Sequence, residues 1–168
     1  MFHSRLLPLL ACAVFSIAGC QKATEAATEA AIARASGQKV EVDRDGGHVR
    51  IKTADGELNM QAGESLPLPA DFPKDIYLPG RYDVNSVMDM GGMQVVSVST
   101  RGKVSGVFAE AQQAMADAGW KQTLSMQHSA DNAMLSYEKD ARAAVLSFNK
   151  GEGGDGVVMG VQLREGKE

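Results

Sequence analysis

Apolar and polar residues alternate along the chain after Lys39, and a period of two is the pattern of β-strands with one apolar face. The apolar positions of three successive runs are Val40 and Val42, Val49 and Ile51, and Leu58 and Met60. Turn-forming residues separate these runs at 44–47 and 54–56. Residues 38–63 are therefore predicted to form a short β meander. Three short strands are marginal alone, so we expect the meander to rest on the main domain or on a partner.

The next segment, 64–81, contains four of the five prolines of the chain. Proline fixes φ and has no backbone N–H, so it disfavours both helix and central strand. We therefore predict a stiff, extended connector between the meander and a larger domain at 82–165.

Period two returns from Tyr82 to Met88, and a Gly-Gly turn leads into a second run from Met93 to Thr100, which predicts a β-hairpin. The pattern then changes to helical spacing over 103–119. Its apolar stripe consists of Val107, Phe108, Ala111, Ala114, Met115 and Ala118. Ser105 is the expected N-cap and Gly119 the expected stop.

Four more short strands are predicted after the helix, beginning at Trp120 and ending at Leu163. The expected fold class of residues 82–165 is α+β, with the order β-β-α-β-β-β-β and an antiparallel sheet packed on one main helix. The β meander of residues 38–63 precedes it.

The first twenty residues differ from the rest because Leu6 to Ala18 form a mainly apolar stretch after a single cation, Arg5. About 13 residues suit the apolar core of a signal peptide and are too few to span a bilayer as a helix. The stretch ends in Ile17-Ala18-Gly19-Cys20. This motif resembles the lipobox of bacterial lipoproteins, whose type II signal peptide is cleaved before the cysteine.

The resemblance implies that residues 1–19 are removed at the cleavage-site residues Ile17, Ala18 and Gly19, and that Cys20 carries three acyl chains. Several chains give stable membrane anchoring, since each buried methylene contributes about 0.8 kcal/mol. It further implies a Gram-negative cell envelope. Residue 21 is Gln rather than Asp, which by family analogy favours the outer membrane over the inner one, with the domain facing the periplasm.

Residues 20–37 follow the cleavage site and are rich in Ala, Thr and Glu, with Thr-Glu-Ala-Ala repeated at 24–27 and 28–31. Ala and Glu favour helix, but an apolar face of alanine offers little area for packing. We interpret the segment as a tether that holds the domain away from the membrane. A coiled-coil helix is the alternative, and it would require larger residues at its seam.

Charge and cysteine content narrow the possible functions. Without residues 1–19 the chain has 16 Lys+Arg against 21 Asp+Glu, a formal net charge of −5, because the leader contains Arg5 and no acid. An acidic chain without a basic stripe does not favour nucleic acid as a partner. Cys12 lies in the leader, so lipidation of Cys20 leaves no thiol for a disulfide, a Cys-ligated zinc site or a nucleophile.

Three short motifs suggest chemistry but lack the context it needs. Gly151 to Gly156 matches G-x-G-x-x-G, yet a strand is predicted to follow it rather than the helix that a nucleotide site requires. Ser147-Phe148-Asn149-Lys150 matches S-x-x-K without the accompanying motifs of penicillin-recognising enzymes. The two histidines outside the leader, His48 and His128, are far apart in sequence. No enzymatic activity, nucleotide or cofactor is therefore predicted.

Met88, Met90 and Met93 crowd one hairpin. Thioethers are soft ligands that select Cu(I), so a copper site is one hypothesis for this hairpin. The alternative is that these methionines fill the core or flank the turn.

Residues 68–79, between a β meander and a ββα-type domain, read Leu-Pro-Ala-Asp-Phe-Pro-Lys-Asp-Ile-Tyr-Leu-Pro. This motif resembles a class of small envelope lipoproteins of Gram-negative bacteria with a helix-grip-like domain. The resemblance implies fold and location rather than a reaction. We therefore expect a membrane-anchored envelope lipoprotein that acts as a non-enzymatic interaction or structural module. Its partner would be another envelope protein, bound for instance by edge-strand pairing. The alternative is a periplasmic Cu(I)-binding protein, and a hydrolase is the weakest hypothesis because the acids are scattered over turns.

Overall fold

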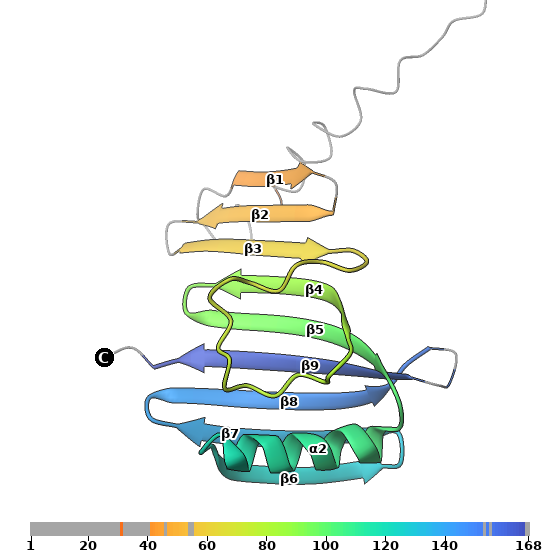
Figure 1. Ribbon diagram of the computed structural model, residues 1–168. Helices are drawn as coiled ribbons and strands as arrows, with labels where there is room; N and C mark the ends of the chain where they lie inside the picture. The colour runs from red at the N-terminus through yellow and green to blue at the C-terminus, as the bar shows by residue number, and fades with distance from the viewer. Residues whose placement is uncertain are drawn as a thin grey trace, which may run out of the picture.

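A computed structural model describes residues 31, 41–45, 47–53, 56–152, 154 and 156–166 of this chain. It contains one continuous antiparallel sheet of nine strands and the helix α2 (Figure 1). The strands are β1 Glu41–Asp45, β2 His48–Thr53, β3 Gly56–Ala62, β4 Asp83–Met90, β5 Met93–Arg101, β6 Lys121–Ser129, β7 Asn132–Lys139, β8 Arg142–Lys150 and β9 Gly156–Glu165. The predicted class, an antiparallel sheet with one main helix, is confirmed.

The lateral order of the strands is β1-β2-β3-β4-β5-β9-β8-β7-β6. The meander β1–β3 is part of the same sheet as the main domain, since β3 pairs with β4 through Met60 opposite Met88. The last of the described strands, β9, lies in the middle of the sheet and pairs with both β5 and β8. The sequence pattern predicted neither the shared sheet nor the central place of β9, because alternation shows which face a residue takes and not which strand lies beside it.

Helix α2, Val104–Asp117, covers one face of the sheet over β6 to β9. Its buried residues are Val104, Val107, Ala111 and Met115. Phe108 packs edge-to-face on Phe148 of β8, with ring centroids 5.7 Å apart. The buried strand residues on the same face include Val96, Val98, Leu135, Leu146, Phe148, Met159 and Val161. The core therefore lies between the helix and the C-terminal part of the sheet.

The two ends of α2 differ in how well they were predicted. Gly119 has a φ of +80°, and its N–H and that of Trp120 donate to Ala116 O and Met115 O, which is the Schellman ending expected of a glycine at this place. The predicted N-cap, Ser105, is wrong. Lys103 is the N-cap, with φ −107° and ψ 146° and no side-chain cap. The chain enters the helix immediately after β5, so Ser105 already lies within the first turn.

The proline-rich connector, predicted to be stiff and extended, does more than join the meander to the main domain. Residues 63–82 fold back across the same face as α2 and run in front of β4, β5, β9 and β8 (Figure 1). Phe72 and Ile76 are buried in the core, with 7% and 5% of their surface exposed. The prolines did correctly indicate a segment without regular structure. The apolar residues between them were the signal that this segment covers the core.

Candidate functional site

The residues predicted to form the membrane anchor, Ile17, Ala18, Gly19 and Cys20, lie outside the described residues, as does the tether apart from Ala31. Lipidation therefore stays a prediction. Among the described residues, no helix is both long enough and apolar enough to cross a membrane.

The three methionines of the predicted copper site lie on one face of the sheet, opposite α2. Met90 and Met93 flank a two-residue Gly-Gly turn whose φ angles are both positive, as a type I′ turn requires. Met88 is two residues before Met90 and therefore points to the same side. Met93 Sδ accepts a hydrogen bond of 3.0 Å from Gln162 Nε2, so one of the three thioethers already has a polar partner.

Sequence reasoning missed a fourth methionine at this place. Met60 lies directly opposite Met88 in the β3–β4 register and shares its face. The alternation of Leu58 and Met60 was visible in the sequence, but the pairing of the meander with β4 was not.

These methionines belong to a larger apolar surface, which we call the outer patch. It consists of Val49, Ile51, Leu58, Met60, Met88, Met90, Met93 and Val95. The register sets them in two rows across β2 to β5, and each row has one member from every strand. Met90 is 45% exposed and the other seven are half-buried. In the part of the chain that the structure describes, neither α2 nor residues 63–82 covers this face.

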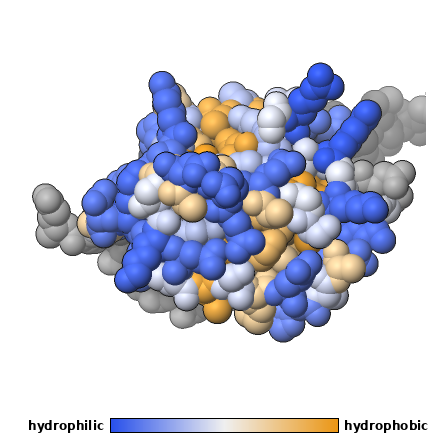
Figure 2. Space-filling view, turned by 60° about the horizontal axis from the view of Figure 1, so that its bottom comes forward, coloured by the Kyte–Doolittle hydropathy of each residue, from blue (hydrophilic) through white to orange (hydrophobic). Residues whose placement is uncertain are grey.

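The end of the molecule at β6 and α2 has a different surface. Figure 2 looks from the β6 end and shows mainly hydrophilic residues, with apolar ones in small separate areas. On β2 and β3 the residues that alternate with the outer patch are polar, and Arg50 donates to Asn59 and pairs with Glu57 at 3.1 Å. A contiguous apolar surface on the outer face therefore contrasts with this polar one.

A second cluster, also missed by sequence reasoning, surrounds Asp75 in residues 63–82, which we call the covering segment because they lie over the core. Arg142 donates Nη1 and Nη2 to the two carboxylate oxygens at 2.9 and 2.8 Å, and Lys139 Nζ donates at 2.8 Å. The Trp120 indole N–H donates to Asp75 O at 2.8 Å, while the Arg142 guanidinium lies 4.8 Å from the Trp120 ring centroid. The Arg142 hydrogen bonds hold the pKa of Asp75 well below its usual range. This cluster, which we call the Asp75 latch, ties the covering segment to the β7–β8 hairpin.

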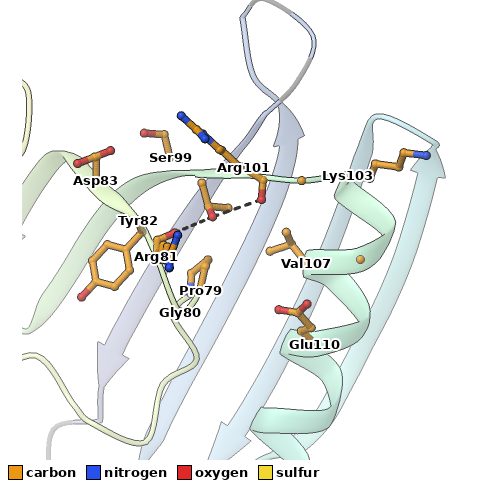
Figure 3. Close-up of a pocket in the computed structure, with 13 residues that line it drawn as sticks. Pro79, Gly80, Arg81, Tyr82, Asp83, Ser99, Arg101, Lys103, Val107 and Glu110 are labelled. Atoms are coloured by element: carbon orange, nitrogen blue, oxygen red, sulfur yellow. Dashed lines mark hydrogen bonds between the residues drawn. The ribbon is translucent and has the colours of Figure 1, made fainter.

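A cleft of about 960 Å³ lies at the N-terminal end of α2 (Figure 3). Its charged residues are Arg81, Asp83, Arg101, Lys103 and Glu110. In Figure 3 the side chains of Arg101 and Lys103 project away from the hollow rather than converging in it.

The cleft lacks the residues of a familiar hydrolytic site. None of its lining residues is a histidine or a cysteine, so these residues cannot form a Ser–His or Cys–His pair. Ser99 Oγ instead lies 3.2 Å from Asn85 Oδ1. Glu110 accepts a hydrogen bond of 2.9 Å from the Tyr77 hydroxyl, and burial together with this carboxylate raises the pKa of Tyr77. These contacts are those of a packed loop and helix.

The remaining sequence motifs lie where the pattern placed them. Ser147 is on β8, and the loop after Gly151 leads into strand β9; Gly153 and Asp155 are outside the described residues. His48 is on β2 and His128 on β6. Within the described ranges, no three His, Cys, Asp or Glu side chains come together as a metal site.

Comparisons with protein-family models, with curated proteins and with solved structures found no match to this chain.

Proposed function

We propose that this chain is a membrane-anchored lipoprotein of the Gram-negative cell envelope. Lipid on Cys20 would hold it on the outer membrane, and its domain would face the periplasm as a non-enzymatic protein-interaction module. The leader and its Ile17-Ala18-Gly19-Cys20 motif support the anchor. The observation that carries the interaction role is the outer patch, because contiguous apolar surfaces of this kind mark sites of contact.

The face of the sheet is a better contact surface than its free edge at β6. That strand has register irregularities between Gln122 and Leu124 and between Gln127 and Ser129. Bulges of this kind are a common protection against pairing with a foreign strand. We therefore assign partner binding to the outer patch rather than to pairing along the β6 edge.

The anchor can be tested in cells that make the full chain. Labelling with an alkynyl fatty acid should tag the wild-type protein and leave Cys20→Ser untagged. The mass of the mature N-terminus should correspond to a triacylated cysteine as the first residue. Equal labelling of both proteins, or an intact leader, would contradict the proposal. Cys12→Ser is the matched control and should label like the wild type.

The contact surface can be tested with a photo-crosslinking amino acid in the full chain, in intact membranes. Placed at Met88 in the outer patch, it should give discrete crosslinked bands. The control position is Ala116, which is exposed on α2. Crosslinks at Ala116 but not at Met88 would contradict the assignment.

A second candidate function is Cu(I) binding, favoured by the position of Met60 beside the three hairpin methionines. Thioethers on one face supply the soft ligands that this ion selects. Titration of Cu(I) should show binding with a Kd well below micromolar. This binding should be lost when Met88, Met90 and Met93 are all changed to Leu. The control is Met134→Leu on β7. Micromolar or weaker binding that the triple change does not alter would remove this candidate.

We also propose that residues 82–165 are a helix-grip-like module of order β-β-α-β-β-β-β, to which the meander of residues 38–63 has been added. The burial pattern supports the separation of the meander, because the described core residues all lie between Phe72 and Leu163; two of them, Phe72 and Ile76, belong to the connector that covers residues 82–165. A chain lacking residues 38–63 should keep a cooperative unfolding transition. Loss of that transition would show that the meander is integral to the domain.

A further inference from the structure

We propose that Met90 is the site at which a peroxide oxidises this protein, and that its sulfoxide interrupts the apolar surface of the outer patch. The second half of this inference rests on the proposed interaction function, because it names how contact through that surface is regulated. The argument begins from exposure. Met90 is 45% exposed, the highest value among the large apolar side chains that the structure describes as exposed.

The turn beside Met90 leaves its thioether open to solvent. Met90 ends β4 and pairs with Met93 across Gly91 and Gly92, neither of which has a side chain. A Cβ at either glycine would have no atom within 4 Å beyond its own chain neighbours. No other described segment therefore packs on the tip of this hairpin, and a small dissolved oxidant can approach the sulfur of Met90.

The other described methionines are less open to an oxidant. Met115 and Met159 have no exposed surface. Met93 is half-buried, and its Sδ accepts the hydrogen bond from Gln162 Nε2, which engages a lone pair that would otherwise attack the oxidant. The remaining half-buried methionines are Met60, Met88, Met126 and Met134. Since oxidation of these side chains follows their exposure, Met90 should react first.

The reaction is a two-electron transfer of one oxygen atom. A lone pair of Met90 Sδ attacks one oxygen of the peroxide, the O–O bond breaks and an S=O bond forms. With hydrogen peroxide the products are methionine sulfoxide and one water. The sulfur is oxidised by two electrons and the peroxide is reduced by two. The surrounding water moves the protons, so no acid or base of the protein is required.

The sulfoxide would place a polar group inside an apolar row. Met90 lies between Leu58 of β3 and Met93 of β5 in the register. Oxidation converts its flexible apolar side chain into a polar one. A partner that covers the outer patch would then bury the S=O group, and burial of a polar group without a hydrogen bond is unfavourable. Oxidation should therefore weaken contact through the outer patch without unfolding the protein, because Met90 lies outside the core.

The first experiment tests the site. The full chain in mild detergent is treated with hydrogen peroxide, and each methionine is followed by peptide mass spectrometry. Met90 should gain one oxygen atom about tenfold faster than Met93, while Met115 and Met159 should react only after unfolding in urea. Circular dichroism before and after treatment confirms that the protein stays folded. Equal rates at Met90 and Met93, or faster oxidation of any other described methionine, would overturn the site.

The second experiment tests the regulation. Crosslinks from the photo-crosslinking amino acid at Met88 are measured in intact membranes before and after peroxide treatment, which should reduce them about fivefold. Met90→Leu keeps an apolar side chain without sulfur, so treatment should cause no fall from that variant's own untreated level. Met134→Leu is the matched control and should lose crosslinks on treatment as the wild type does. A fall that persists in Met90→Leu would overturn the regulation.

A polar variant tests the same step without an oxidant. Met90→Gln has a side chain of similar length to the sulfoxide and should reduce the crosslinks at Met88 before any treatment. Unchanged crosslinks in folded Met90→Gln, or in peroxide-treated protein whose Met90 is oxidised, would contradict the effect of the polar group on this surface.

The proposed function and this inference fail in different ways. If Met88 forms no crosslinks before treatment, the interaction function and its regulation are both wrong, and mass spectrometry still decides the site of oxidation. If Met88 does form crosslinks but Met90 is not the first methionine oxidised, the interaction function stands and this inference is wrong.

Discussion

The carboxylate of Asp75 accepts hydrogen bonds from both terminal guanidinium nitrogens of Arg142, which lies 67 positions further along the chain. This bidentate pair joins the proline-rich segment to the β7–β8 hairpin, and Lys139 connects the same carboxylate to the carbonyl of Ala118 at the end of α2. Charge-assisted pairs of this geometry are the strongest hydrogen bonds of a protein surface. The latch thus fixes where the covering segment lies on the core.

Removing the carboxylate should destabilise the fold measurably. Asp75→Ala leaves two partly buried cations without their acceptor, so we expect the free energy of unfolding to fall by about 2 kcal/mol. Urea denaturation of the purified protein would measure this. Asp131→Ala is the control, since its 3.7 Å pair with Lys150 is largely exposed and should contribute no more than about 0.5 kcal/mol. Equal effects of the two changes would contradict the role of the latch.

The latch should also make stability depend on acidity. The pKa of Asp75 is lower in the folded protein than in the unfolded chain, where it is about 3.9. Below about pH 4 the unfolded state binds more protons, so the latch contribution is present above this pH and is lost as the pH falls further. The difference in unfolding free energy between wild type and Asp75→Asn should therefore shrink between pH 5 and pH 2. A constant difference would show that Asp75 is not the titrating group.

Phe72 tests whether the proline-rich segment belongs to the core. Its side chain is 7% exposed, so Phe72→Ala should cost about 3 kcal/mol through lost burial and the cavity left behind. Lys74→Ala changes an exposed residue of the same segment and should alter the unfolding free energy by less than about 0.5 kcal/mol. If Phe72→Ala had as little effect as Lys74→Ala, the segment would be a connector that does not contribute to the core.

Truncation of Tyr137, unlike that of Phe72, is expected to leave the stability of the fold unchanged or to raise it. The side chain is 2% exposed, and its hydroxyl has no hydrogen-bond partner among the described residues. Burial accordingly raises the pKa of this phenol. Tyr137→Phe removes a buried unsatisfied polar group, so thermal unfolding should show equal or greater stability, by up to about 1 kcal/mol. A loss of more than 1 kcal/mol would reveal a partner for this hydroxyl.

Residue 21 should decide the membrane in which the proposed lipoprotein resides. Gln21→Asp is expected to move the protein from the outer to the inner membrane fraction on a sucrose gradient. Gln21→Asn keeps the side chain neutral and should leave the distribution unchanged. An unchanged distribution of the Asp variant would contradict sorting by this position.

The strands and the helix of this fold could be predicted from the sequence far better than the pairing of segments that lie far apart along the chain. Period two in Val96 and Val98 and helical spacing from Val107 to Met115 identified strand and helix, because each depends only on local geometry. The bond between Asp75 and Arg142 and the alignment of Met60 with Met88 depend on chain folding over long separations. No local pattern specifies such pairings, and for that reason the latch and the full extent of the outer patch emerged only from the structure.

The place of β9 has a consequence for the order in which this protein can be completed. The strands on either side of it, β5 and β8, hydrogen-bond to β9 rather than to each other. Because β9 follows the other described strands in the chain, the groups β1–β5 and β6–β8 cannot join through it until β9 itself has been synthesised.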